Sequence, residues 1–217
     1  MIRRFTPSAA LMLALGLLLL ALGYWRAWLP HSSAALTLLG VDLPEFVKFV
    51  PEVRSGQIAL RREVFFQPLL ALTGGMLLLA TLRQPPLPGW MRLALAALVI
   101  PAALSMLPPA WTPALLRTPE FRTQVWYILL LLLGVALSPL LQRFLPDRVR
   151  GLLFVGLALL PLPALRAYLR LQPALAVLYG QAPALGAGFY LTAVGALLLG
   201  LGGLLLILRP GPARRRA

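Results

Sequence analysis

Charged residues in this chain are confined to a few short segments, and between them lie uncharged, apolar stretches that are each about one bilayer crossing in length. The hydrocarbon core of a bilayer is roughly 30 Å thick, and a helix needs about 20 apolar residues to cross it. Of the 217 residues, 60% are hydrophobic and 12% are charged. Soluble domains are nearer 45–50% apolar and about 25% charged. The pattern therefore predicts an all-α integral membrane protein.

The apolar stretches predict one membrane domain over residues 1–217 with six transmembrane helices, at about 6–28, 64–82, 90–108, 123–142, 150–170 and 186–208. The first stretch follows Arg3-Arg4, as a cleaved signal peptide would, but its length and its aromatic end at Tyr24-Trp25 favour a retained anchor. The fifth is short before Arg166, so its helix either continues past that residue or is a partial span. Residues 171–185 are then expected to form a surface or re-entrant segment.

A longer connection, the outer loop of residues 30–63, contains the clearest amphipathic pattern. Leu43, Phe46, Val47 and Val50 recur at i, i+3, i+4 and i+7, which places them on one face of a helix. This spacing predicts a short amphipathic helix in the outer loop, lying on the membrane surface.

Basic residues in the short loops predict the orientation. With both ends cytoplasmic, the inner segments hold eleven of the 20 basic residues and one acid, Asp147. The positive-inside rule applies best to such short loops, so we expect an N-in, C-in protein of the cell membrane, the inner membrane in a bacterium. The eleven are Arg3, Arg4, Arg83, Arg92, Arg143, Arg148, Arg150, Arg209, Arg214, Arg215 and Arg216.

Several chemistries lack the residues they need. The chain has no cysteine and a single histidine, His31, which excludes thiol catalysis, zinc–thiolate sites and haem held by two histidines of this chain. No acid lies within an apolar stretch, and intramembrane acids are the usual mark of ion-coupled transport. We therefore predict no catalytic residue, metal site or cofactor. The net charge of +14 is explained by arginines flanking the spans, so no nucleic-acid partner is expected.

Arginine pairs are the candidate ligand-binding residues. Arg166 and Arg170 are four positions apart, so they share a helix face where they could bind a carboxylate or phosphate, including that of a lipid head group. The alternative is that both side chains only reach toward the interface and end the helix. The pair Arg61 and Arg62 carries the same two interpretations.

Small residues recur every four positions in the sixth span, at Gly188, Thr192, Ala196 and Gly200. Such a stripe lets a second helix approach closely. The second helix could belong to this chain or to a membrane protein partner.

Three functions remain open. The favoured one is a non-catalytic subunit or accessory factor of a membrane assembly, with the bilayer as its medium. The second is a small-solute-binding or transport component with an outward-facing site. Six spans with a long first outer loop resemble the layout of the substrate-binding membrane subunits of vitamin importers, which implies a solute site there. The third is a lipid-active enzyme at the outer interface, which would need one acid from Asp42, Glu45, Glu52, Glu63 and Glu120 beside Arg166.

Overall fold

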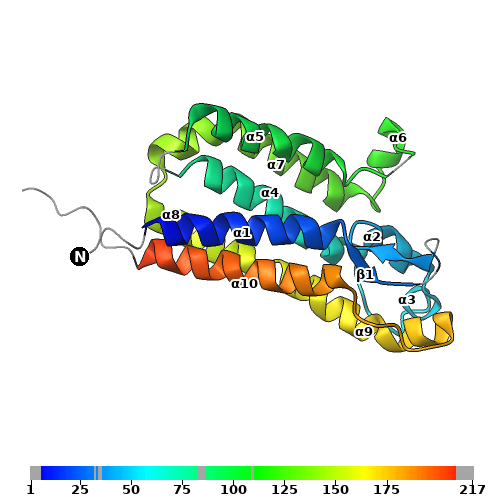
Figure 1. The fold of residues 1–217 in the computed structure, drawn as a ribbon. Helices are drawn as coiled ribbons and strands as arrows, with labels where there is room; N and C mark the ends of the chain where they lie inside the picture. The colour runs from blue at the N-terminus through cyan, green and yellow to red at the C-terminus, as the bar shows by residue number, and fades with distance from the viewer. Residues whose placement is uncertain (1–5, 32, 34–35, 83–86, 109, 209–217) are drawn as a thin grey trace, which may run out of the picture.

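The computed structural model is mostly helical and describes residues 6–31, 33, 36–82, 87–108 and 110–208 (Figure 1). Of the arginines used to predict the orientation, Arg92, Arg143, Arg148 and Arg150 lie within these ranges, and the others lie outside the described residues. The longer helices are α1 (Thr6–Tyr24), α4 (Gln67–Ala80), α5 (Gly89–Leu104), α7 (Arg122–Phe144), α8 (Asp147–Leu159), α9 (Pro161–Tyr179) and α10 (Ala187–Ile207). Five of the predicted spans each overlap one of these helices, and the predicted span 150–170 overlaps two, α8 and α9.

Four helical segments among the described residues are long and apolar enough to cross a membrane. They are Arg62–Ala80, Arg122–Phe144, Asp147–Tyr179 and Ala187–Ile207. The apolar helices Ala9–Tyr24 and Gly89–Leu104 are shorter. The chain is thus a mostly helical protein with the helices of a membrane protein.

Helices α1 and α10 pack closely along their length because glycines line their contact. A Cβ atom at Gly195 of α10 would lie 2.9 Å from the backbone oxygen of Gly16 and 2.8 Å from the backbone nitrogen of Leu20 in α1. Gly23 faces Thr192 and Gly188 in the same way. Backbone contact at this distance is possible only where side chains are missing.

The other side of α10 packs on α8. A Cβ atom at Gly203 would lie 2.8 Å from the backbone oxygen of Gly151, and one at Gly200 would lie 3.3 Å from the Cβ of Ala158. Within the described residues, the small residues of α10 thus face two helices of this same chain. A partner would have to bind elsewhere than on this stripe.

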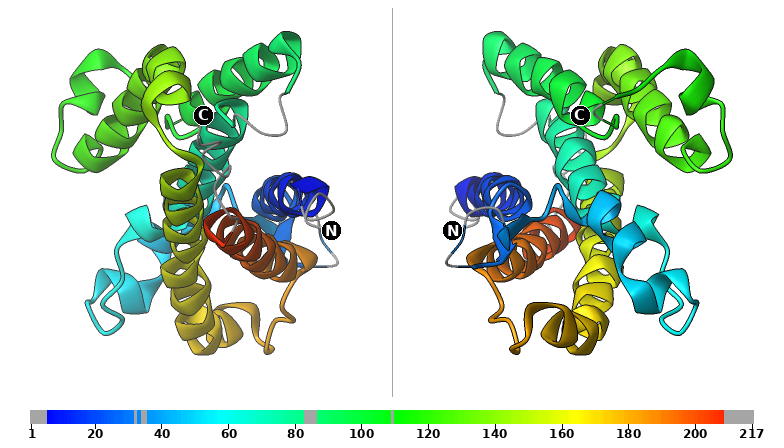
Figure 2. Two further views of the ribbon diagram at one scale, coloured as in Figure 1. Left: turned by 90° about the vertical axis from the view of Figure 1, so that its left-hand side faces the viewer. Right: turned by 90° about the vertical axis from the view of Figure 1, so that its right-hand side faces the viewer.

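Helix α4 lies between two groups of helices. It contacts α1 and α8 on one side and α5 and α7 on the other. Figure 2 shows the α5–α7 pair diverging from the α1–α10 pair, while α8 and α9 run obliquely past α10. Helix α7 is therefore much less covered by protein: 17% of the most apolar part of Arg122–Phe144 is buried, against 67% of the most apolar part of Arg62–Ala80, which includes α4.

Residues 147–179 form an almost unbroken helical run, which corrects the expected end of the fifth span. The helix continues past Arg166 and Arg170 to Tyr179, so the expected surface or re-entrant segment at 171–185 is helical over its first half. Proline does not stop the run because Pro161 occupies the first turn of α9, where no amide donor is needed. Gly180, in the left-handed conformation at φ 69°, ends α9.

The described residues between 25 and 66 form a folded cap over one end of the bundle rather than an extended loop. The cap contains β1 (Ala27–Leu29), antiparallel to β2 (Leu38–Leu39), with Ala27 opposite Leu39. The short helices α2 (Leu43–Phe46), η2 (Val47–Phe49), α3 (Pro51–Arg54) and η3 (Arg62–Phe66) follow. The other short helix, α6 (Pro113–Leu116), lies between α5 and α7.

The cap has a hydrophobic core of its own, separate from the core of the helix bundle. Leu43, Val47 and Val50 are each 1% exposed and pack in this core against α9 and Phe65, with Phe46 at its edge. The apolar face predicted for 43–50 therefore exists, but it faces protein and not the membrane surface. Periodicity identifies an apolar face and does not identify what covers it.

At the opposite end of the bundle, Arg150 joins α7 to α8. Its guanidinium is fully buried, pairs with Asp147, and donates hydrogen bonds to the backbone oxygens of Leu141 (3.0 Å) and Gln142 (3.1 Å). These carbonyls lie in the last turn of α7, where helical partners are missing and the helix dipole is negative. Arg150 was expected only to set the orientation of the chain, and it also caps the C-terminal end of α7.

Candidate functional site

The cap core is built around Trp28. Its indole ring contacts Phe65, Tyr168 and Phe189 edge to face, with ring centroids 6.5, 5.3 and 5.7 Å apart, respectively. The indole nitrogen donates to the backbone oxygen of Gly23 (3.0 Å). These aromatic side chains join β1, η3, α9 and α10, so the cap is fixed to the helices below it.

A charged cluster fastens the cap to the start of α7. Arg62 is 7% exposed, pairs with Glu45, and donates to the backbone oxygen of Glu120 (2.9 Å). Its guanidinium carbon lies 4.6 Å from the ring centroid of Phe121. Lys48 forms ion pairs with both Glu45 and Glu120, and its Nζ lies 2.9 Å from Oε1 of Glu120. We call Glu45, Lys48, Arg62, Glu120 and Gln124 the clamp.

Gln124 extends the clamp into α5. Its side chain is fully buried; the amide oxygen accepts from Arg62 (3.2 Å), and the amide nitrogen donates to the backbone oxygen of Met106. Both ends of the amide are thus used, and the clamp links the cap to the segments at the ends of both α5 and α7. Glutamine near the start of an apolar span was not recognised in the sequence as a functional or structural residue.

The clamp sets the ionisation of Lys48. Partial burial lowers the pKa of its ammonium group, but hydrogen bonds and charge attraction from Glu45 and Glu120 outweigh this effect. The net result is a pKa above the ordinary lysine value, so Lys48 stays protonated across the physiological range.

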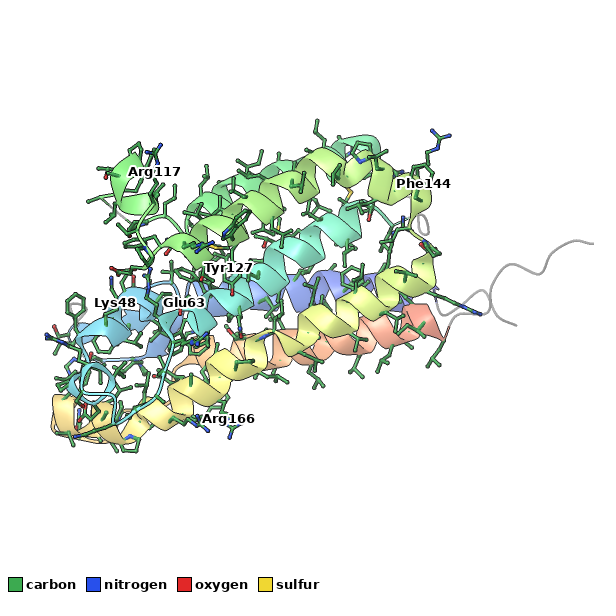
Figure 3. The ribbon with its side chains drawn as sticks, turned by 180° about the vertical axis from the view of Figure 1, so that it is seen from behind. Lys48, Glu63, Arg117, Tyr127, Phe144 and Arg166 are labelled. Atoms are coloured by element: carbon green, nitrogen blue, oxygen red, sulfur yellow. The ribbon has the colours of Figure 1, made fainter. Side chains whose placement is uncertain are left out.

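The acids that an enzyme would need are largely engaged in holding the cap. Glu45 and Glu120 belong to the clamp, and Asp42 accepts from the backbone nitrogen of Leu39 (3.2 Å) in a turn. Figure 3 shows Lys48 and Glu63 near the cap and Arg166 on the far side of α9, pointing away from them. Over the described residues, no group of three or more histidine and acidic side chains could hold a metal ion.

The structure separates the candidate arginines. Arg62 is buried in the clamp, whereas its neighbour Arg61 is exposed. Arg166 and Arg170 are both exposed on one face of α9, as their spacing predicts for a helix. The two pairs are thus not equivalent: one of the four arginines is already bound by protein groups.

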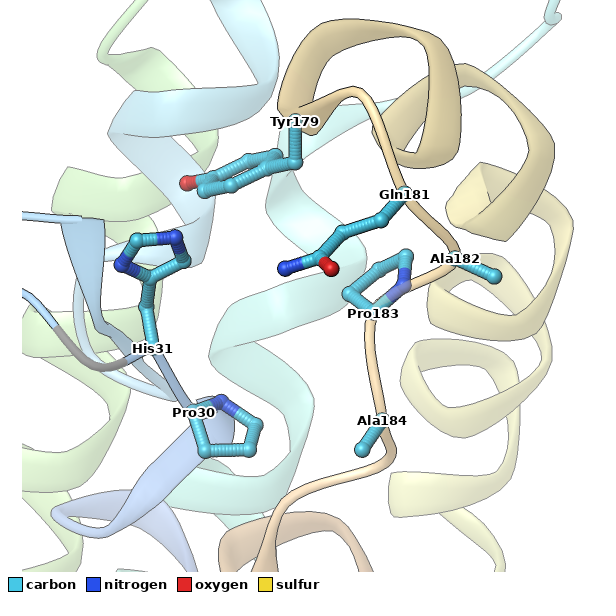
Figure 4. A pocket seen from close by; sticks show the side chains of 7 residues that line it. All are labelled: Pro30, His31, Tyr179, Gln181, Ala182, Pro183 and Ala184. Atoms are coloured by element: carbon cyan, nitrogen blue, oxygen red, sulfur yellow. The ribbon is translucent and has the colours of Figure 1, made fainter.

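A cavity of about 300 Å³ opens at the edge of the cap, between residues 30–31 and residues 179–184. Figure 4 shows His31 and Gln181 facing each other across it, with Tyr179 beside them. The ring centroids of His31 and Tyr179 are 5.8 Å apart. His31 Nδ1 accepts from the backbone nitrogen of Ser33 (3.0 Å), which leaves Nε2 to carry the proton of the neutral ring. Neither Arg166 nor Arg170 lines this cavity.

No known protein family, curated protein or solved structure matches this chain.

Proposed function

We propose that this chain is a multi-pass protein of the cell membrane that crosses the bilayer six times, with both ends in the cytoplasm, and serves as a non-catalytic subunit of a larger membrane assembly. In this proposal the cap lies on the outer face, and the exposed face of α5 contacts the partner. The observation that carries the proposal is that the other helices of this chain leave much of the α5–α7 pair uncovered. In addition, the charged groups of the cap are used to hold that pair in place.

Exposed aromatic residues support the membrane placement. Trp126 near the start of α7 is 61% exposed, and Phe144 at its end is 70% exposed. They are 18 positions apart, which corresponds to about 27 Å of helix and so to one hydrocarbon core. Trp90, 71% exposed, lies at the start of α5. Aromatic side chains at both limits of a span are typical of membrane interfaces.

The orientation can be tested by cysteine labelling because the chain has no cysteine of its own. Ser55→Cys in the cap and Arg148→Cys in the first turn of α8 both place the thiol at an exposed position. We expect a membrane-impermeant maleimide to label S55C in intact cells and R148C only after permeabilisation. The reverse order would contradict the orientation.

The contact between α5 and its partner is inferred from residue size. The exposed face of α5 includes Ala94, Ala97 and Pro101, which lie at i, i+3 and i+7. The exposed face of α7 is dominated by leucine, with Ala136 and Pro139 as smaller members, whereas on α5 the exposed Leu93 and Leu98 lie beside the strip of small residues. Small residues favour helix contact, whereas leucine is equally suited to lipid. The α5 face therefore fits a transmembrane helix of another protein.

The test is native gel electrophoresis of the tagged chain from its own membranes, solubilised in mild detergent. We expect a complex larger than the monomer, lost in Ala97→Trp and retained in the matched control Ala136→Trp. Monomer mobility of the wild-type chain, or equal behaviour of the two variants, would contradict the proposal. A mass of two chains would identify the partner as a second copy.

Small-solute binding is the second candidate, favoured by the cavity at His31. Its volume of about 300 Å³ lies at the lower end of the range of ligand sites, and His31 and Gln181 offer polar groups to a ligand. Thermal unfolding of the wild type and of H31L/Q181L, with a panel of small polar solutes, tests this function. A solute that stabilises only the wild type would support it, and the absence of any such solute would count against it.

A further inference from the structure

One face of α9 carries exposed basic and apolar side chains together. Arg166 and Arg170 are exposed, and so are Leu162 (49%), Leu169 (48%) and Val177 (79%). Leu162, Leu169 and Arg170 each lie three or four positions from Arg166, which places these side chains on one side of the helix, and Val177 lies seven positions beyond Arg170. A helix face exposed to water alone does not need such a set of large apolar residues.

The opposite face of α9 is occupied by protein. Ala164, Tyr168, Leu171 and Leu175 are buried in the cap core. Neither Arg166 nor Arg170 forms an ion pair with any acid that the structure describes. Figure 3 shows Arg166 pointing away from the rest of the chain. The two guanidinium groups are thus free to bind a group from outside the protein.

The length of the helix gives the positions of Arg166 and Arg170 across the bilayer. The run Asp147–Tyr179 has 33 residues, or about 50 Å, against a hydrocarbon core of roughly 30 Å. Arg166 follows Asp147 by 19 positions, or about 28 Å, and Arg170 lies about 6 Å further. If the inner end of α8 lies at one interface, Arg166 and Arg170 lie at the head groups of the other. This step rests on the membrane placement proposed above.

We propose that this face of α9 binds the phosphate of an anionic phospholipid in the leaflet on the cap side. Arg166 and Arg170 hold the phosphate, since two guanidinium groups one turn apart can donate several hydrogen bonds to its oxygens. Leu162, about 6 Å nearer the bilayer centre than Arg166, contacts the glycerol and the upper acyl chains, and Leu169 lies between the two arginines at the level of the head groups. The site thus explains why basic and apolar residues alternate on this face.

The experiment is native mass spectrometry of the full chain in detergent, titrated with phosphatidylglycerol. The test variant is R166A/R170A, and the matched control is R54A/R117A, which removes the same charge from two exposed positions in the cap and after α6. Each basic residue near an anionic head group contributes a factor of about five, so we expect about thirtyfold weaker binding in R166A/R170A and little change in the control. R166K/R170K, which keeps the charge but loses the planar donors, should be intermediate.

Equal affinity of the two double variants would overturn the proposal. So would binding of inorganic phosphate as tight as that of phosphatidylglycerol, since the ligand would then be a free anion. Phosphatidylcholine, which has the phosphate without net charge, should bind more weakly than phosphatidylglycerol. Thermal unfolding of each variant verifies that binding is compared between folded proteins. Binding in detergent does not depend on orientation, so a failed cysteine-labelling test and a failed lipid titration are separate results.

Discussion

The hydroxyl of Tyr168 donates a hydrogen bond of 2.6 Å to the backbone oxygen of Trp28, and it thereby joins residues 140 positions apart in the sequence. The same oxygen accepts from the backbone nitrogen of Gly186 at 2.8 Å. One carbonyl of β1 thus receives donors from α9 and from the segment before α10. The arrangement predicts that this side chain contributes to the stability of the cap.

We expect Tyr168→Phe to lower the free energy of unfolding by about 1 kcal/mol. The loss is limited because the ring can keep its contact with Trp28, and the carbonyl oxygen keeps its bond to Gly186. Chemical unfolding in detergent, followed by tryptophan fluorescence, measures the change. Tyr190→Phe is the control, since Tyr190 is 55% exposed, and it should leave the midpoint unchanged.

Arg62 and Arg61 provide a second comparison, between neighbouring residues of the same type. Arg62→Met should lower the free energy of unfolding by about 2–3 kcal/mol, because Gln124 is left buried without its donor and Glu45 loses a partner. Arg61→Met, at an exposed position, should change it by less than about 0.5 kcal/mol. Similar effects of the two substitutions would show that the clamp does not stabilise the fold.

The raised pKa of Lys48 predicts a pH dependence with a definite sign. A lysine whose pKa is higher in the folded chain stabilises that state below its unfolded pKa, and the contribution is lost as the pH rises through the folded pKa. We therefore expect the difference in unfolding midpoint between the wild type and Lys48→Met to be constant near neutral pH and to shrink above a pH of about 10. A difference that grows in alkali would contradict the pairing with Glu45 and Glu120.

Close packing of α1 on α10 gives a third matched pair. Gly195→Ala places a Cβ atom against the backbone of Gly16 and Leu20, so the helices must separate, and we expect a loss of roughly 2 kcal/mol. Gly156→Ala in α8 meets no atom within 4 Å, and it should be neutral or slightly stabilising because alanine favours helix. Thermal unfolding of both variants in the same detergent compares them. An equal loss in both would contradict the close packing of α1 on α10 as the cause, since Gly156 has no such contact.

The apolar stretches identified where the helices lie, because charge is excluded from spans of bilayer length whatever the neighbours are. At the fifth span they left two alternatives open, because Arg166, Pro161 and Pro163 could each end the helix; in the structure the helix continues past Arg166. Arginine ends a span but not a helix, and proline in a first turn interrupts no hydrogen bond. Local sequence carries neither distinction clearly.

The site residues show the same limit. Arg61 and Arg62 are indistinguishable in the sequence, and only the approach of Glu45 and Glu120 from distant segments separates an exposed side chain from a buried one. Gln124 acquires its role from Met106 and Arg62, which no local pattern indicates. Spacing along one helix, as at Arg166 and Arg170, was enough to place both on a common face.

The cap core has a consequence for biosynthesis. Trp28 follows α1, whereas Phe189, which completes its aromatic surroundings, belongs to α10 and is synthesised 161 residues later. The early half of the cap must therefore wait, with Leu43, Val47 and Val50 still uncovered, until α9 and α10 have been synthesised. A chain truncated before α10 would expose this apolar surface, and quality-control chaperones and proteases could recognise the unfinished protein by it.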